Sequence, residues 1–429
     1  MLKSWAKKIV FLIGIYILSV SLVYAQPIVK KITVNNTTYK VTFNESMAFI
    51  SRDGSEAVPI KSGTTISKPG TYFVSLYDEN NGLVGINTFT IQNKQDKDNW
   101  VVTSEDQLEE IFKYAFENYK STIVLQFKTG KYNIDSMQKL VSNTSDSVAE
   151  KYPMLVIRSC TFSMMGNNNP IVKAQIQYPL KVTNTLRTYE NKTKSKIIDI
   201  LNHRVFPKQK DYEIELALYK YLVDNVKYSK TVENDQIYIT SSPSTHTMFG
   251  TLIDQVAVCD GYAKSLMYLL NSCGIPTKFV GGTSENMGHA WNIVKIQGKY
   301  YHVDATWGDT DDEYSASYYQ YFNENDAHMS QTHSWDITKY PKTESKEHNL
   351  LFLPVTINNL YKVRNSNELD SVLNEIKTKK QATIIFYNCS TEGWTKEKAA
   401  SYIVNALNTG IRYQYDEKYD CLAITYSAS

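Results

Sequence analysis

The chain has 429 residues, of which 42% are hydrophobic, so it is long enough for several domains that each bury a core. Its 46 basic and 44 acidic residues leave a net charge of +2, and this balance argues against a nucleic-acid-binding protein. The five cysteines are an odd number, so at least one of them stays unpaired if the chain is exported.

A targeting segment is predicted at the N-terminus. Three lysines precede an apolar run over residues 9–23, and the small residue Ala25 follows in the position of a signal-peptide cleavage site. We therefore expect residues 1–25 to be a signal peptide, so that the mature protein is secreted or held at the cell surface with no membrane association. The alternative is an uncleaved membrane anchor, for which the apolar run is short.

Residues 27–93 are predicted to form a small β-sandwich. Hydrophobic and polar residues alternate in strand-like stretches, with turn residues such as Arg52-Asp53-Gly54 between them. The stretches are residues 31–34, 39–43, 71–77 and 87–91. With its Gly70-Thr71-Tyr72 strand and its Asn80-Asn81-Gly82 turn, this region resembles bacterial immunoglobulin-like surface modules. The resemblance implies a spacer, with ligand binding as the alternative.

Two similar segments flank the middle of the chain. Residues 102–111 resemble residues 363–372, and each copy continues with an apolar strand, a helical stretch and two alternating strands. We predict two α/β modules of β-α-β-α-β-β order, over residues 96–183 and 358–429. They could bind a cell-wall or cell-surface polymer or shape the cleft of the central domain, and the sequence leaves both open. The polar stretch 184–195 is predicted to be a linker.

The central region, residues 195–345, contains a cysteine that is placed to open a helix. Apolar residues recur at helical spacing after Cys259, and Gly274 with Pro276 gives that helix a stop. A sulfur at a helix N-terminus lies near unpaired backbone N–H groups and the positive end of the helix dipole. Both stabilise a thiolate relative to a thiol.

A histidine and an aspartate follow on a predicted hairpin. The dipeptide Gln297-Gly298 predicts a two-residue turn, from which the register of the two strands can be counted. In that register Trp291 lies opposite Asp304, so His289 and Asp304 are diagonal neighbours on one face of the ribbon. Their Cβ atoms are then up to about 7 Å apart, within reach of a hydrogen bond between carboxylate and imidazole. A register shifted by one residue would place them on opposite faces.

These three side chains predict a site for thiol acyl transfer. Cys259 would attack a carboxamide or acyl carbon, His289 would move the proton, and Asp304 would orient the imidazole. The backbone N–H of Cys259 is a natural oxyanion donor. Gln255 and His246 are further pocket candidates, each as a possible second oxyanion donor. Trp291 and Trp307 either wall the acyl tunnel or belong to the core.

No cofactor and no metal site is predicted. No pair of cysteines has the spacing of a zinc site. The acidic residues within 309–313 lack the complete ligand pattern of a calcium loop, so a solvated loop is expected there.

Three linked motifs resemble the transglutaminase-like superfamily of papain-type thiol enzymes. They are Val258-Cys259-Asp260-Gly261-Tyr262-Ala263, His289-Ala290-Trp291-Asn292 and Tyr301-His302-Val303-Asp304-Ala305-Thr306-Trp307-Gly308-Asp309. The predicted helix 212–228 and residues 246–252 resemble the segment that precedes the cysteine in microbial members. The resemblance implies a multidomain α+β protein whose papain-like core carries a Cys/His/Asp triad on a helix packed against an antiparallel sheet.

The resemblance implies activities that range over transamidation, peptide hydrolysis and deglycosylation. We expect a secreted thiol enzyme that acts on protein or peptide substrates through an acyl-thioester. One alternative is a cysteine peptidase that cleaves cell-surface or cell-wall peptides, with water as the acyl acceptor. The other is a surface-binding protein in which the triad is catalytically idle.

Overall fold

The computed structural model describes residues 28–32, 38–92, 98–127, 134–165, 171–179, 183–233, 236–239, 242, 244–309, 319–345, 347–349, 360–363, 366–377, 381–387, 393–408, 410–416 and 421–427. The predicted signal peptide, residues 1–25, and the acidic residues 311–313 lie outside these ranges. Within the described ranges, no helix has the length and the apolar character needed to cross a membrane.

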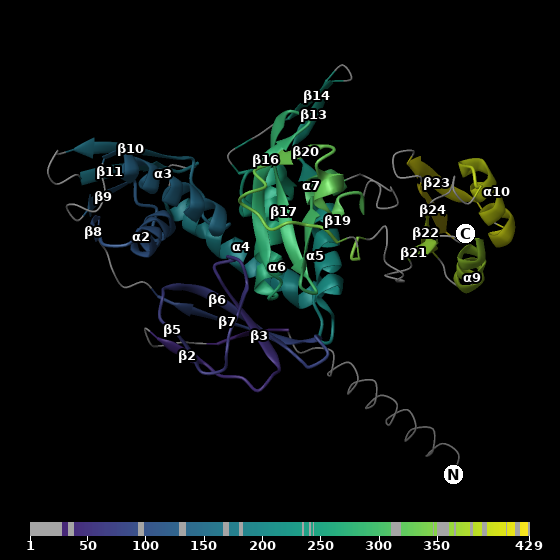
Figure 1. Ribbon diagram of the computed structural model, residues 1–429, viewed down its shortest axis with the longest axis horizontal. Coiled ribbons are helices and arrows are strands. Elements are labelled where there is room, and N and C mark those ends of the chain that lie inside the picture. The colour runs from purple at the N-terminus through teal and green to yellow at the C-terminus, as the bar shows by residue number, and fades with distance from the viewer. Residues whose placement is uncertain are drawn as a thin grey trace, which may run out of the picture.

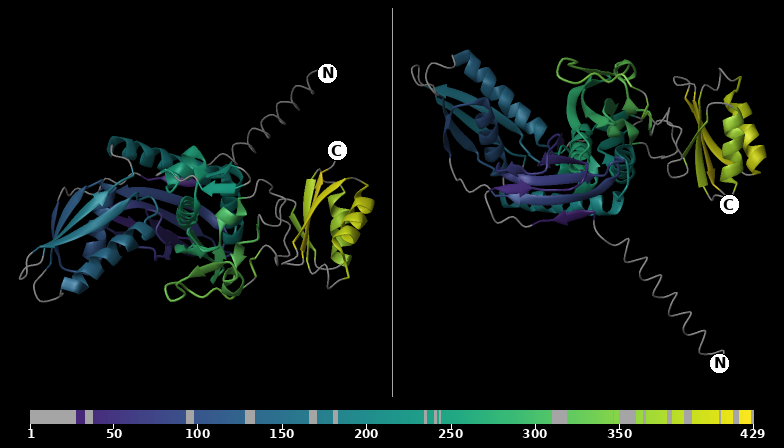
Figure 2. Two further views of the ribbon diagram at one scale, coloured as in Figure 1. Left: turned by 90° about the horizontal axis from the view of Figure 1, so that it is seen from above. Right: turned by 60° about the horizontal axis from the view of Figure 1, so that its bottom comes forward.

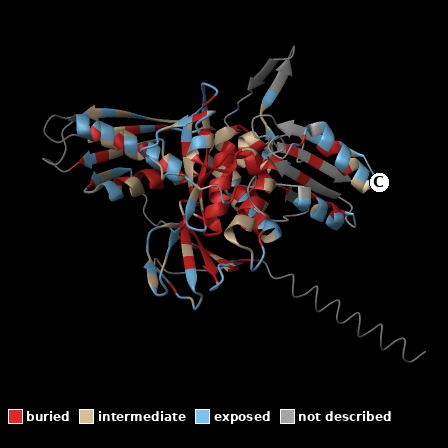
Figure 3. Cartoon of the chain, turned by 45° about the vertical axis from the view of Figure 1, so that its right-hand side comes forward, coloured by how far each residue is buried: buried red, intermediate tan, exposed pale blue. Residues whose placement is uncertain are grey.

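The central domain is built on a five-stranded antiparallel sheet in the order β19-β18-β17-β16-β20 (Figure 1). The strands are β16 (Thr277–Ser284), β17 (Met287–Ile296), β18 (Lys299–Val303), β19 (Phe322–Glu324) and β20 (His333–Trp335). Helices α5 (Asp211–Asn225) and α6 (Cys259–Ser272) pack together, and α6 lies against β16 and β17. Apolar side chains of α5, α6, β17 and β18 share one core, and Figure 3 shows the buried residues gathered there.

Helix α6 begins at Cys259 and is followed by the predicted glycine stop. Val258 is its N-cap residue, with extended backbone angles of φ −107 and ψ 179. Gly274 has φ +79, in the left-handed region that favours glycine, and a Cβ atom built there would lie 2.9 Å from the Cβ of Ser75. Both predictions for the limits of this helix are therefore confirmed.

The hairpin of β17 and β18 has the predicted register. Gln297 and Gly298 both have positive φ, 48 and 83, as a two-residue hairpin turn of type I′ requires. Ile296 pairs with Lys299, and the ladder runs on to Asn292 opposite Val303. The prediction is wrong only at its last step, because pairing stops at Val303 and Asp304 leaves the sheet to cap the short helix α7 (Ala305–Gly308).

Two sheets make up the N-terminal region. A five-stranded sheet has the order β1-β7-β6-β3-β4, and β2 pairs with β5. The strands are β1 (Val29–Lys31), β2 (Tyr39–Val41), β3 (Met47–Arg52), β4 (Val58–Pro59), β5 (Thr64–Ile66), β6 (Gly70–Tyr77) and β7 (Leu83–Ile91). The sheets share a core in which the rings of Tyr39 and Phe89 lie 4.3 Å apart. The region is thus rich in strands as predicted, and its immunoglobulin-like identity stays a prediction.

The N-terminal strands lie against the helices of the central domain (Figure 2), and β3 and β6 contact α6. Asn271 of α6 accepts a hydrogen bond from the backbone N–H of Ala57 at 2.9 Å and donates one to the carbonyl of Gly54 at 3.0 Å. The hydroxyl of Tyr77 donates to the carbonyl of Cys273. Polar groups at the end of the helix that carries Cys259 are therefore satisfied by another region of the chain.

The two flanking segments have the same order of elements and of strands. The first contains β8 (Asn99–Val102), α2 (Glu105–Glu117), β9 (Thr122–Phe127), α3 (Ile134–Lys151), β10 (Ser159–Met165) and β11 (Ile171–Gln177). The second contains β21 (Leu360–Val363), α9 (Ser366–Ile376), β22 (Gln381–Tyr387), α10 (Lys396–Leu407), β23 (Ile411–Asp416) and β24 (Cys421–Ser427). Their sheets run β8-β9-β11-β10 and β21-β22-β24-β23, with the first pair parallel and the others antiparallel. Their origin as copies of one unit stays a prediction.

The predicted linker, residues 184–195, is helical, so that prediction is wrong. It lies within α4 (Thr183–Arg204). Leu186, Thr193, Ile197 and Leu201 are buried along one side of this helix, at helical spacing. The buried threonine and the many polar residues between the apolar ones hid this periodicity in the sequence.

Short elements deliver Cys259 to the surface of the core. The strand β15 (Val256–Ala257) ends two residues before Cys259 and pairs in parallel with β12 (Lys227–Tyr228). The π-helical turn η1 (Gly250–Asp254) precedes β15. The hairpin of β13 (Lys230–Glu233) with β14 (Gln236–Ile239) and the helix α8 (Asp326–Met329) complete the domain.

Candidate active site

Cys259 is the first residue of α6, and its side chain is partly exposed. The backbone N–H of Val258, the cap residue before it, donates to the carbonyl of Thr245 at 3.1 Å, which ties the preceding loop to the start of the helix. The first N–H groups of an α-helix have no acceptor within the helix. The sulfur therefore sits where backbone N–H groups and the helix dipole favour negative charge.

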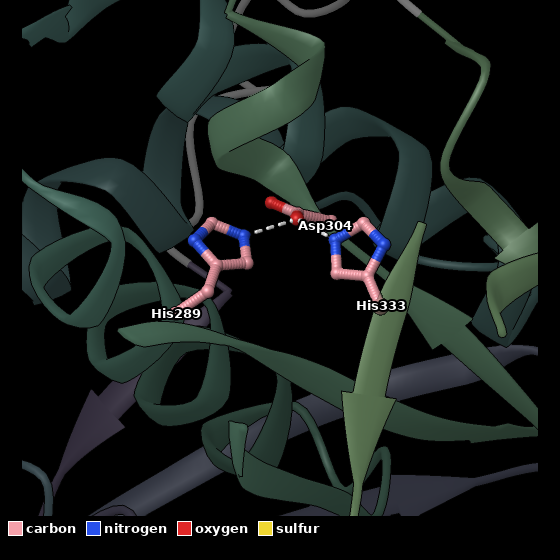
Figure 4. A group of neighbouring side chains, drawn as sticks. All are labelled: His289, Asp304 and His333. Atoms are coloured by element: carbon pink, nitrogen blue, oxygen red, sulfur yellow. Dashed lines mark hydrogen bonds and ion pairs between the residues drawn. The ribbon is translucent and has the colours of Figure 1, made fainter. Parts of the chain in front are cut away.

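His289 lies on β17, opposite Gly282 of β16, and contacts both other members of the predicted triad. Its Nε2 atom is 2.6 Å from Oδ2 of Asp304 (Figure 4). A carboxylate oxygen only accepts, so Nε2 carries the hydrogen and Nδ1 is left for Cys259, whose side chain hydrogen-bonds to this imidazole.

The charges around His289 favour the imidazolium form. Burial disfavours the charged ring and lowers its pKa, but the charge and hydrogen bond of Asp304 and the hydrogen bond and charge of Cys259 raise the pKa of His289 to about 10. At neutral pH the ring can therefore hold a proton beside the side chain of Cys259. An imidazolium paired with a thiolate is the reactive form in thiol catalysis.

Asp304 is held by four N–H groups. Its Oδ1 accepts from the backbone of Thr306 at 2.8 Å and of Trp307 at 3.1 Å, because Asp304 is the N-cap of α7. Its Oδ2 accepts from His289 and from a second histidine, His333. Burial opposes ionisation, but the charges and hydrogen bonds of the two histidines lower the pKa of Asp304 well below its usual range. The carboxylate is therefore ionised and fixed in orientation.

His333 was not identified from the sequence. It lies on β20, opposite Ser284 of β16, and its Nε2 is 3.1 Å from Oδ2 of Asp304. The side chain is fully buried. Strand pairing between segments almost 50 residues apart brings it to the site, and the only local signal is a histidine at the start of a short alternating stretch.

One group of side chains in the described part of the chain has the spacing of a metal site. It consists of His289, Asp304 and His333, whose ligand atoms lie within 4.8 Å of one another. Both Nε2 atoms point at the same oxygen, which stands between them (Figure 4). The hydrogen bonds account for all three ligand atoms, so the group is a hydrogen-bonded array.

The two tryptophans lie at different depths. Trp291 is only 1% exposed, and its indole N–H donates to Nδ1 of His302 at 2.9 Å, while Nε2 of His302 lies 2.9 Å from Asp326. It therefore packs beneath His289, with ring centroids 5.9 Å apart. Trp307, on α7, is partly exposed and lies edge-on to His289 at 6.5 Å. Of the two, Trp307 is the one that can border a substrate.

His246 and Gln255 lie on the loop that precedes α6. His246 is exposed, and its Nδ1 is 2.8 Å from Oδ1 of Asp260, the residue after Cys259. The hydrogen bond and charge of Asp260 raise the pKa of His246. Gln255 is exposed at the end of η1, with φ 57, and its backbone carbonyl accepts from the N–H of Lys227. The structure thus places His246 beside Asp260, the residue that follows Cys259, whereas the backbone of Gln255 holds β12.

One family model matches part of the chain. Residues 201–305 match the model of the Transglutaminase-like superfamily. No curated protein matches the chain. A solved structure of a candidate cysteine protease from Cytophaga hutchinsonii is similar at 12% identity and a TM-score of 0.21, over 35% of this chain and 65% of that one.

Two further solved structures are similar. One, named a TGase, has 13% identity and a TM-score of 0.25 over 68% of this chain and 80% of its own. The other is the periplasmic domain of TgpA from Pseudomonas aeruginosa, with 13% identity and a TM-score of 0.19 over 33% of this chain and 55% of its own. The chain thus spans less than two thirds of the length of the Cytophaga and Pseudomonas structures.

The matched residues coincide with the site. They run from α4 through α5 and α6 to the first residue of α7, and so include Cys259, His289 and Asp304. Together these residues form a helix that begins at a cysteine and packs on antiparallel strands, with a histidine on β17 and an aspartate directly after β18. Residues 201–305 of this chain are therefore a transglutaminase-like core.

Proposed function

We propose that this protein is a thiol enzyme that transfers acyl groups of protein or peptide substrates through Cys259, His289 and Asp304. One observation carries the proposal. A single imidazole is hydrogen-bonded on one nitrogen to a buried carboxylate, at 2.6 Å, and interacts through its ring with a cysteine at a helix N-terminus. Nucleophile, base and orienting group are then in contact, as nucleophilic catalysis requires.

In the first half-reaction, the thiolate of Cys259 attacks the carbonyl carbon of a carboxamide or peptide bond and forms a C–S bond. The charge that develops on the carbonyl oxygen faces the backbone N–H of Cys259. His289 then donates its Nδ1 proton to the leaving nitrogen, and the C–N bond breaks. Ammonia or an amine departs and the acyl group remains as a thioester on Cys259.

In the second half-reaction, the neutral imidazole of His289 takes a proton from an acceptor at Nδ1. The acceptor forms a new bond to the acyl carbon, and the thiolate of Cys259 leaves. An amine gives transamidation, and water gives hydrolysis. Throughout, Asp304 keeps the ring in the tautomer that presents Nδ1 to the sulfur.

The exposure of the three side chains supports a large substrate. Cys259 is partly exposed, whereas the side chains of His289 and Asp304 are 8% and 0% exposed. The residue that carries the sulfur thus reaches the surface, while the base and its partner are largely shielded from water. A protein side chain or a peptide segment laid across the start of α6 suits this arrangement.

The other regions belong to the same proposal. We infer that the chain is exported, that residues 27–93 form an immunoglobulin-like module, and that the modules at 96–183 and 358–429 are copies of one unit that binds a cell-wall or cell-surface polymer. The identical order of strands in the two described sheets supports the duplication.

Alkylation tests the proposed nucleophile. Iodoacetamide should label Cys259 faster than the other cysteines near neutral pH, and Cys259→Ala should remove the fast phase. Cys160 and Cys273 are internal controls, because burial raises the pKa of Cys160 to about 11 and raises that of Cys273 further. Equal, slow labelling of all cysteines would instead favour a surface-binding protein with an idle triad.

To identify the acyl acceptor, the products formed by the wild type are compared with those formed by Cys259→Ala. Transamidation predicts that a labelled primary amine is incorporated into a glutamine-containing protein by the wild type alone. A cysteine peptidase predicts new peptide termini without incorporation of the amine. Released ammonia without either product would indicate hydrolysis of a side-chain amide.

A further inference from the structure

We propose that His333 is a positioning residue of this site, which holds Asp304 so that Cys259, His289, Asp304 and His333 work as a four-membered array. The inference rests on the proposed thiol chemistry and deepens it. It assigns a role to a buried imidazole that the three-residue arrangement does not use.

The two histidines reach the carboxylate from opposite sides (Figure 4). Nε2 of His333 lies 3.1 Å from Oδ2 of Asp304, and Nε2 of His289 lies 2.6 Å from the same atom. The other oxygen, Oδ1, accepts two backbone N–H groups of α7. A carboxylate with donors on both oxygens and from two sides cannot rotate without breaking several hydrogen bonds.

Hydrogen bonding also determines the form of His333. Because Oδ2 only accepts, Nε2 of His333 carries a hydrogen. On the other side of the ring, Oγ1 of Thr332 lies 2.8 Å from Nδ1, and the hydroxyl of Tyr321 lies 3.2 Å from that Oγ1. A continuous chain of hydrogen bonds therefore runs from Tyr321 through Thr332 and His333 to Asp304.

The surroundings of His333 leave its ring little freedom. The side chain has 0% exposure. The rings of Trp291 and Tyr321 stand edge-on to it at 5.0 and 5.2 Å, and strand pairing fixes its backbone opposite Ser284. Because packing holds the ring of His333 in place, its N–H group can hold the carboxylate of Asp304 in one orientation.

A second donor on Asp304 has a use in the reaction cycle. His289 gains and loses its Nδ1 proton in each half-reaction, so the strength of its hydrogen bond to Asp304 changes. The hydrogen bond from His333 takes no part in these transfers. It keeps Oδ2 in place while His289 is neutral, and the ring of His289 then stays aimed at Cys259.

The test compares His333→Leu with His333→Gln. Leucine removes the donor, whereas the amide of glutamine can reach Oδ2 with an N–H in the place of Nε2. The rate of iodoacetamide labelling of Cys259 should fall about 10- to 100-fold in His333→Leu, the value of one hydrogen bond to a charged group, and should largely recover in His333→Gln. His203→Gln, on the exposed surface of α4, is the control and should label as the wild type does.

The pH profile separates positioning from a merely structural role. The rate of Cys259 labelling falls at low pH, and in His333→Leu this acid limb of the profile should move to higher pH. The reason is that the imidazolium of His289, when it is held less firmly toward Cys259, stabilises the thiolate less. An unchanged limb would overturn the inference. A limb that moves to lower pH would also overturn it, since His333 would then compete with His289 for Asp304.

Two provisions keep the test decisive. If both variants fail to fold, as judged by thermal melting, Thr332→Val is tested, because it removes the hydroxyl next to Nδ1 and keeps His333. We expect the acid limb of the labelling profile to shift in the same direction by a smaller amount. No shift overturns the inference. If the wild type itself shows no fast labelling of Cys259, the proposed function fails. Fast labelling that is equal in wild type and His333→Leu would overturn only the role of His333.

Discussion

The substitution Asp304→Asn tests the site most directly, because it changes the chemistry of one side chain and leaves its shape. The carboxylate accepts four N–H groups, at 2.6 and 3.1 Å on Oδ2 and at 2.8 and 3.1 Å on Oδ1. Asparagine offers one oxygen and one NH₂ group. If the oxygen keeps the cap of α7, the NH₂ group faces the N–H groups of His289 and His333.

The expected loss follows from this mismatch. His289 can pair with the new amide only if its hydrogen moves from Nε2 to Nδ1, and Nδ1 then cannot take a proton. A hydrogen bond to a charged group is worth about 1.5–3 kcal/mol, which corresponds to a loss in rate of about 10- to 100-fold. The same exchange in a Ser-His-Asp triad costs about 10⁴-fold because the tautomer is wrong. We therefore expect kcat/KM and the labelling rate of Cys259 to fall by at least about 100-fold.

A second histidine–aspartate pair, of the buried His302 with the partly exposed Asp326, provides a control. Asp326 lies 2.9 Å from Nε2 of His302, in the same domain, and its pair does not include His289. Asp326→Asn also takes the carboxylate partner from a buried histidine and should lower the melting temperature. Labelling of Cys259 should stay within about threefold of the wild type, the spread expected for a substitution outside the site. Wild-type labelling in Asp304→Asn, or an equal loss in both variants, would refute the assignment of Asp304 as the orienting group.

Three further outcomes are expected. The pKa of His289 is raised to about 10, so the ring is protonated below that pH. Turnover, measured by ammonia release, should therefore fall as the pH rises through about 10, while the rate of Cys259 labelling should not. The same pH dependence for turnover and labelling would contradict this. Asn271→Ala leaves buried backbone groups of Gly54, Ala57 and Thr277 without their partner and should lower the free energy of unfolding by about 3 kcal/mol or more in urea titrations, and a loss near zero would speak against the docking of the N-terminal region. Burial raises the pKa of the fully buried Glu215, so this group favours folding below its unfolded pKa and disfavours it as the pH rises; Glu215→Gln should thus stabilise the protein more at pH 8 than at pH 5, and an equal effect at both pH values would contradict it.

Local features of the site were predictable from the sequence because their causes are local. The start of α6 at Cys259 follows from the apolar periodicity of the residues after it. The end of the helix follows from Gly274, which takes a left-handed backbone position that favours glycine. The register of β17 and β18 follows from the two residues of their turn, Gln297 and Gly298. Each of these depends on neighbours within one element or one turn.

Features that depend on distant partners were not predictable. Counting along a ladder cannot tell where pairing stops, and so it missed that Asp304 caps a helix while still reaching His289. His333 enters the site through pairing of β20 with β16, which no local pattern encodes. Residues 184–195 are helical as the first part of α4, whose later residues, such as Ile197 and Leu201, lie in the core shared with α5 and α6.

Helix α6 joins the candidate site to the N-terminal region. Its first residue is Cys259, and its last turn is held by Asn271 and by the carbonyls of Ser272 and Cys273, which accept hydrogen bonds from Ser75 and Tyr77. A helix moves as a rigid rod over this length, so a constraint at one end limits the position of the other. A region that acted only as a flexible spacer would not bury polar contacts of this kind. The N-terminal sheet therefore helps to place Cys259, although none of its described residues forms a hydrogen bond with the side chains of His289 and Asp304.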